Sequence, residues 1–103
     1  MIITICGSLK FKQEMMEIAE KLTFTGHCVL TPLFRAECDI QPTPEQMQKL
    51  KQSHFCKIDL SDAILVVNVD NYIGESTHTE IEYATQKGKK VFYYTALPAD
   101  LMQ

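Results

Sequence analysis

The chain lacks the features that would assign it to several functional classes. No apolar run approaches the length of a membrane-spanning helix, so we expect no insertion into a membrane. Lysine and arginine number 10 against 13 aspartates and glutamates, and the formal net charge of -3 provides no global basic field for binding a nucleic-acid polymer. No internal repeat, linker or low-complexity segment is present, so residues 1–103 are expected to form one domain.

The cysteines indicate neither a disulfide framework nor a metal site. Cys6, Cys28, Cys38 and Cys56 form no Cys-x-x-Cys pair, and no histidines cluster at zinc-ligand spacing. We therefore expect free thiols and no metal, with Cys6 and Cys28 buried because both fall in apolar, strand-like runs. Free thiols favour a reducing compartment, and the start of the chain shows no basic leader, so a cytoplasmic location is expected.

Strand-like and helix-like segments alternate along the chain. Short apolar, β-branched runs predict buried strands over residues 1–6, 27–31, 63–69 and 90–94. Apolar residues at helical spacing predict helices over 10–25, from Pro44 after the cap Thr43, and from Ser76 or Thr77 to Gly88. This order predicts an α/β fold, a flavodoxin- or Rossmann-like three-layer sandwich whose parallel sheet has four or five strands in the order 2-1-3-4.

Ligands of such sheets bind beyond the carboxyl ends of the strands, where the strand order reverses. Here that point lies between the first and third predicted strands, and residues 6–10 and 68–77 form the loops that reach it. Gly7 precedes a helix, which directs backbone N–H groups toward an anion, while Ser8 adds a hydroxyl and Lys10 a positive charge. The alternative, which composition alone favours, is structural: Gly7 makes the turn, Ser8 caps the helix and Lys10 is solvated.

Glu80 is the most informative residue near the second loop. Ile81 and Ala84 mark the packed face of the third helix, and Glu80 flanks that face, so its carboxylate can be partly buried near a ligand. A carboxylate held in a cleft can attack a sugar carbon as a nucleophile. The alternative is that Thr77 and Glu80 form a T-x-x-E capping box at the helix start. Glu82 is expected to face solvent.

Two further polar residues are candidates for the same site. His54 lies with Met47, Leu50 and Ile58 on one face of the second predicted helix, so it is either a core histidine or a residue that reaches the crevice. Asn68, near the end of the third strand, either contacts a ligand or shapes the loop.

The order of these motifs resembles the nucleoside 2-deoxyribosyltransferase-like superfamily. The resemblance covers the first strand and residues 54–94, and its matching segments are 62–68, 74–77, 80–84 and 88–90. The first loop, Cys6-Gly7-Ser8-Leu9-Lys10, is similar to the Cys-Gly-Ser-aliphatic-Arg loop that grips the 5'-phosphate in the 2'-deoxynucleoside 5'-phosphate N-hydrolase branch.

The resemblance implies cleavage of the N-glycosidic bond of a (deoxy)nucleoside 5'-monophosphate, without a cofactor, through a covalent glycosyl intermediate on Glu80. It also implies that His54 assists at the anomeric centre, and that the small nucleoside or nucleotide is bound by Cys6, Gly7, Ser8, Lys10, Asn68, Gly74 and Ser76. Relatives of this kind are homodimers or larger homo-oligomers in which a neighbouring subunit helps to close the site.

Three positions depart from the family pattern. Gly74 stands where transferases have an aspartate and hydrolases a serine, with Ser76 as the nearest substitute. His54 aligns with a family aspartate, and Glu82 with a glycine. Three alternatives therefore stand beside hydrolysis: base exchange between deoxynucleosides, a non-catalytic nucleotide-binding or sensing module, and a plain interaction domain.

Overall fold

A four-stranded, fully parallel sheet forms the centre of the protein in the computed structural model, which describes residues 1–36 and 39–103. The strands are β1 (Ile2–Cys6), β2 (Cys28–Leu30), β3 (Ala63–Val66) and β4 (Lys90–Tyr93). They lie in the order β2-β1-β3-β4, so the predicted order 2-1-3-4 is confirmed, with four strands. The order reverses between β1 and β3, which are paired from Ile3 opposite Ala63 to Cys6 opposite Val66.

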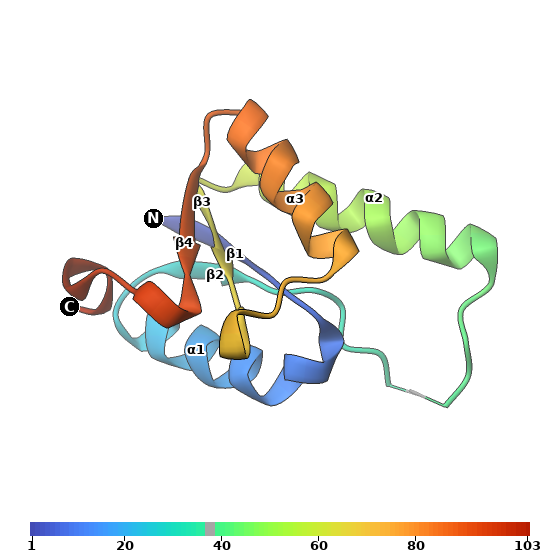
Figure 1. Ribbon diagram of the computed structural model, residues 1–103, viewed down its shortest axis with the longest axis horizontal. Coiled ribbons are helices and arrows are strands. Elements are labelled where there is room, and N and C mark those ends of the chain that lie inside the picture. The colour runs from blue at the N-terminus through green and yellow to red at the C-terminus, as the bar shows by residue number, and fades with distance from the viewer. Residues whose placement is uncertain (37–38) are drawn as a thin grey trace.

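Helices cover both faces of the sheet and make the predicted three layers. Figure 1 shows α1 (Lys12–Phe24) on one face and α2 (Pro44–Leu60) with α3 (Glu75–Gln86) on the other. Four 3-10 turns complete the described parts of the chain, η1 (Leu9–Phe11), η2 (Val69–Asn71), η3 (Tyr94–Ala96) and η4 (Ala99–Met102). None of the helices within residues 1–36 and 39–103 has the length and apolar character needed to cross a membrane.

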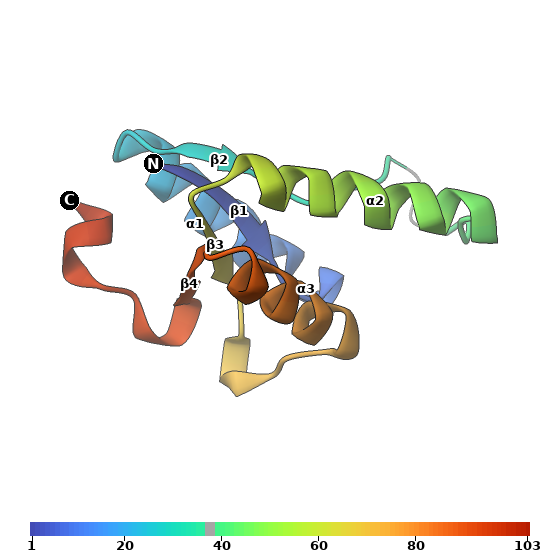
Figure 2. The same ribbon diagram turned by 90° about the horizontal axis from the view of Figure 1, so that it is seen from above.

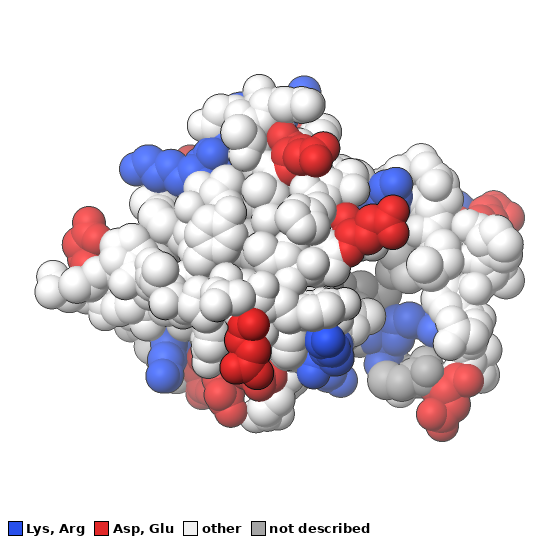
Figure 3. Space-filling view, viewed as in Figure 1, with Lys and Arg blue, Asp and Glu red and all other residues white. Residues whose placement is uncertain are grey.

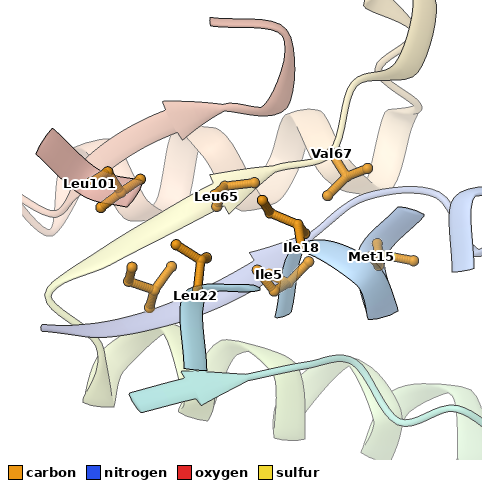
Figure 4. Close-up of a cluster of buried hydrophobic side chains, with 8 residues drawn as sticks. Ile5, Met15, Ile18, Leu22, Leu65, Val67 and Leu101 are labelled. Carbon is orange, nitrogen blue, oxygen red and sulfur yellow. The ribbon is translucent and has the colours of Figure 1, made fainter. Parts of the chain in front are cut away.

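The side chains of the sheet alternate between two separate core clusters, as the strand period of two requires. Ile3 and Ile5 of β1 face α1, whereas Cys6 faces α2 and α3. The cluster on the α1 side consists of Ile3, Ile5, Met15, Ile18, Leu22, Leu65, Val67 and Leu101 (Figure 4). The cluster on the other side consists of Cys6, Ile58, Ile64, Val66 and Ala84.

The start of α2 follows the sequence prediction closely. The Thr43 hydroxyl accepts a hydrogen bond from Gln46 N at 3.1 Å, the Gln46 side chain accepts one from Thr43 N at 2.9 Å, and Pro44 occupies the first turn. This capping box satisfies donors that a helix start leaves free.

The predicted apolar face of α2 is only partly buried, because the helix is longer than the sheet beneath it. The 17 residues of α2 span about 25 Å, whereas strands of four or five residues span about 13–17 Å. The amino-terminal half therefore projects past the sheet, as Figure 2 shows, and Met47 is 54% exposed. Only His54 and Ile58 of the helix are buried.

Two other expectations are wrong. Cys28 is exposed, because β2 is an edge strand whose residues are at most partly covered, and β3 ends at Val66 rather than at residue 69. Cys6 and Cys56 are free thiols like Cys28, and Cys38 lies outside the described residues.

Candidate functional site

Three side chains from three elements meet beyond the carboxyl end of β1, where the strand order reverses. Cys6 ends β1, His54 lies in α2 and Glu80 lies in α3. The Nε2 atom of His54 is 3.4 Å from Cys6 Sγ and 3.4 Å from Glu80 Oε1. The structure therefore brings together both predicted catalytic residues and one predicted binding residue, which we call the Cys6–His54–Glu80 cluster.

The cluster is shielded from bulk water but not closed. Cys6 has no exposed surface, and the side chains of His54 and Glu80 are 11% and 18% exposed. His54 Nδ1 is buried and has no hydrogen-bond partner among the described residues, whereas Nε2 faces the Glu80 carboxylate. A neutral ring therefore carries its proton on Nε2, an assignment made from these contacts.

The Cys6 thiol is held in its protonated form. Burial raises its pKa well above the usual value, and the negative charge of Glu80 and a hydrogen bond to that carboxylate raise the pKa further. A thiolate is the reactive form of cysteine, so this thiol is a poor nucleophile at neutral pH. The carboxylate of Glu80 is the group of the cluster that is suited to attack.

Glu80 does not cap α3, so the capping-box interpretation is wrong. The helix begins at Glu75 with Gly74 as its extended N-cap, and His78 N donates to Gly74 O at 3.0 Å. Thr77 lies inside the first turn and is buried, which leaves Glu80 in the second turn. From this position the Glu80 carboxylate reaches His54 Nε2 at 3.4 Å.

A groove of about 1430 Å³ opens beside the cluster. Its walls are the two predicted loops, the irregular segment before α2 and the projecting half of α2, and Figure 3 shows the hollow between this half and the body. Six of the predicted site residues line it: Gly7, Ser8, His54, Gly74, Ser76 and Glu80. Phe34 and Arg35, which precede α2 in the irregular segment, line it as well.

Gly7 holds the first loop tightly against the end of β3. A Cβ atom at Gly7 would lie 3.1 Å from Val67 O and 3.4 Å from Val67 Cβ, while Val67 N donates to Cys6 O at 2.8 Å. The Ser8 hydroxyl accepts from Lys10 N at 3.4 Å and caps η1. The turn predicted at Gly7 is confirmed, whereas Ser8 caps η1 and not the predicted helix, since α1 has Phe11 at its N-cap without a side-chain hydrogen bond. Both residues also line the groove.

Lys10 does not line the groove. Its Nζ atom is 3.3 Å from the centroid of the ring of Tyr72, a residue that does line the groove, and makes a cation–π contact with it. The lysine next to the first loop that lines the groove is Lys12, and Lys49, Lys51 and Lys57 of α2 line it as well.

Asn68 also takes a structural role. Its Nδ2 donates to Thr95 Oγ1 at 3.0 Å and its Oδ1 accepts from Thr95 N at 3.3 Å, which ties the end of β3 to η3. Of the two interpretations of Asn68, the structure supports the one in which it shapes the loop.

A second, smaller cavity of about 260 Å³ lies elsewhere and is lined by Met1, His27, Lys90 and Leu101 among others. The Cys6–His54–Glu80 cluster is not part of its walls. The large groove therefore combines space for a small molecule with a partly buried carboxylate, an imidazole and a glycine-serine loop. Comparison of the chain with protein-family models, curated proteins and solved structures gave no match.

Proposed function

We propose that the protein cleaves the N-glycosidic bond of a nucleoside or deoxynucleoside 5'-monophosphate, with Glu80 as nucleophile. The observation that carries the proposal is the position of the Glu80 carboxylate. It is 18% exposed, lies 3.4 Å from His54 Nε2, and lines the same groove as the Gly7-Ser8 loop. Glycosidic cleavage by a carboxylate needs this combination of a fixed nucleophile and a nearby proton donor.

The reaction proceeds in two displacements. The Glu80 carboxylate forms a bond to the anomeric carbon, the bond from that carbon to the base breaks, and the electron pair leaves with the base nitrogen. For this step His54 must be in its imidazolium form: it gives one proton to the departing base and becomes the neutral ring. Water then attacks the anomeric carbon, the bond to Glu80 breaks, and His54 receives the proton. The products are the free base and the sugar 5-phosphate.

The phosphate end of the substrate is assigned to the amino-terminal side of α1. Backbone N–H groups at Gly7 and Ser8 precede that helix, and Lys12 adds a positive charge in the same groove. Gly74 offers only its backbone, so Ser76 supplies the hydroxyl of the second loop. Phe34 and Arg35 are assigned to the base.

The proposal includes a homodimer or larger homo-oligomer in the cytoplasm, acting on a small molecule rather than on a nucleic-acid polymer. It is supported by three apolar side chains that line the groove and remain more than half exposed, Leu33, Ile40 and Met47. A second copy of the chain would cover such residues.

The test is release of free base from each common nucleoside and deoxynucleoside monophosphate, separated by chromatography. We expect Glu80→Gln to lower the rate by more than about 10³-fold, because the amide cannot form the glycosyl ester. Glu82→Gln is the matched control, since Glu82 lies in the same helix and is exposed. Equal rates for Glu80→Gln and the unaltered protein would overturn the assignment of the nucleophile.

The same assay separates the alternatives. Addition of a second free base produces a new nucleoside if the protein exchanges bases, and leaves the products unchanged if water is the acceptor. Binding of a nucleotide without base release, with equal affinity in Glu80→Gln, would identify a binding or sensing module instead.

A further inference from the structure

The Cys6–His54–Glu80 cluster is arranged around a common point and not as a proton relay. In a cysteine-histidine-acid relay, one ring nitrogen faces the thiol and the other faces the carboxylate. Here Nε2 alone lies 3.4 Å from both Cys6 Sγ and Glu80 Oε1, and Nδ1 has neither as a partner. One atom each of sulfur, nitrogen and oxygen therefore converge from three different elements.

These separations match the edges of a metal coordination tetrahedron. With zinc bonds of about 2.3 Å to sulfur and about 2.0–2.2 Å to nitrogen and oxygen, neighbouring ligand atoms lie about 3.3–3.7 Å apart. The three ligand atoms of the cluster all lie within 4.8 Å of one another, with two of the edges already at 3.4 Å. The remaining edge, between Cys6 Sγ and the Glu80 carboxylate, is at most 4.8 Å long and has to reach coordination distance to complete the triangular face.

We propose that Cys6, His54 and Glu80 bind a zinc ion, with the fourth coordination position directed to the groove. Thiolate and imidazole ligands select zinc over magnesium and calcium, which take oxygen ligands. His54 and Glu80 line the groove and Cys6 lies buried behind them, so the ion would enter between two partly exposed ligands. Three protein ligands and one open position form a site that exchanges its fourth ligand.

Binding would rearrange the protons of the cluster. The Cys6 thiol releases its proton to solvent as it becomes a thiolate ligand, and the His54 proton moves from Nε2 to Nδ1. A ligating histidine normally donates its second N–H to an acceptor, and His54 Nδ1 has none among the described residues. Since loss of such an acceptor weakens metal binding about 10–100-fold, we expect zinc to exchange readily.

The consequence for activity rests on the proposed function, whereas zinc binding itself does not. Zinc would occupy the Glu80 carboxylate and remove the nucleophile, so turnover would require a free cluster. The protein would then cleave its substrate in the presence of a chelator and lose activity when stoichiometric zinc is added.

Cobalt titration of the full chain tests the site, because tetrahedral cobalt bound to thiolate absorbs in both the near ultraviolet and the visible. We expect one cobalt per chain with a thiolate charge-transfer band, displaced by zinc. Cys6→Ser should abolish the band, and Glu80→Gln should weaken cobalt binding more than about 10-fold. Circular dichroism checks folding, and Glu80→Gln keeps the test decisive if the buried Cys6→Ser variant does not fold.

The matched control is the double variant Cys28→Ser/Cys56→Ser, which removes the two exposed thiols of the described residues. Its cobalt spectrum should equal that of the unaltered protein. Absence of a charge-transfer band at stoichiometric cobalt would overturn the site, as would a band that survives Cys6→Ser and disappears in the double variant.

The two proposals fail separately. A cobalt spectrum without base release under any condition supports the metal site and contradicts the glycosidase. Base release in chelator without a cobalt spectrum supports the glycosidase and contradicts the metal site.

Discussion

The two faces of the sheet bury very different side chains, although the same strands supply both. On the α1 side, all eight members of the core cluster are apolar. On the side of α2 and α3, the smaller apolar cluster adjoins buried polar groups, among them Thr4, His54 and Ser61. Apolar burial is the larger source of stability, and a buried polar group must be satisfied by partners. The α1 side is therefore suited to stabilise the fold, and the side of α2 and α3 is suited to carry the candidate site.

The polar groups of the second face form two sets with different roles. Thr4 Oγ1 lies 2.6 Å from Ser61 Oγ, and the two hydroxyls lie 3.1 Å and 2.8 Å from Lys57 O. Because each hydroxyl has one proton, the shorter contacts assign Thr4 as donor to Ser61 and Ser61 as donor to Lys57 O. This set joins the end of α2 to β1 and thereby fixes the position of His54 along the helix. The Cys6–His54–Glu80 cluster is the second set, whose members face one another and the groove.

The largest expected effect on stability is that of Leu65→Ala on the α1 side. Leu65 is fully buried, so the truncation should lower the free energy of unfolding by about 2–5 kcal/mol. Urea denaturation measures the change. Cobalt binding by the folded protein should stay the same, since Leu65 faces away from α2 and α3. A loss of stability below about 1 kcal/mol would contradict the role given to this face.

Thr4→Val tests the first polar set on the opposite face, with a smaller expected effect. Valine keeps the shape of the side chain, and Ser61 still donates to Lys57 O, so no buried group loses its last partner. We expect a loss of about 1 kcal/mol in the free energy of unfolding. Urea denaturation is the measurement. A loss as large as that of Leu65→Ala would show that both faces of the sheet contribute equally to the free energy of unfolding.

Tyr83→Phe is the smallest of the three changes. The Tyr83 hydroxyl donates to Asp59 Oδ1 at 2.6 Å and links α3 to α2. This hydrogen bond is the largest cause of a tyrosine pKa above the usual value, and desolvation and the negative charge of Asp59 raise the pKa further. The protonated form is favoured in the folded state. The link therefore stabilises the fold below about pH 10 and is lost as the pH rises through the raised folded pKa.

The measurement is urea denaturation of Tyr83→Phe and the unaltered protein from neutral to alkaline pH. The two should differ below the usual tyrosine pKa and converge above the raised value. A difference that grows as the pH rises would contradict the sign of this contribution. Ultraviolet titration should also show one tyrosine of the unaltered protein ionising at higher pH than in a model peptide.

The layers and strand order were predictable from the sequence, because buried strands and amphipathic helices carry different periods and crossovers have one hand. The start of α3 was not. Glycine gives a weaker N-cap signal than serine or threonine, so the sequence favours a start at Ser76 or Thr77 over the observed N-cap Gly74. The position of the Lys10 side chain was not predictable either, because its aromatic partner Tyr72 comes from a distant loop and leaves no local sequence pattern.

The members of the site were found, but their mutual geometry was not. Cys6, His54 and Glu80 lie on three elements, and metal-ligand spacing along a chain detects only ligands that share one or two elements. Their meeting depends on how far α2 and α3 lie along the sheet, which is fixed by packing and by contacts such as that of Thr4 with Ser61.

The pairing of β1 with β3 has a consequence for the synthesis of the protein. Ile3 lies opposite Ala63, so the edge of β1 that pairs with β3 stays uncovered until about 60 more residues have been synthesised. This takes about 3–12 s at typical ribosomal rates. During that time only β2 is available as a neighbour, and the nascent chain exposes an apolar strand edge. Translation speed through residues 32–62 therefore bears on how much of this protein reaches its native sheet.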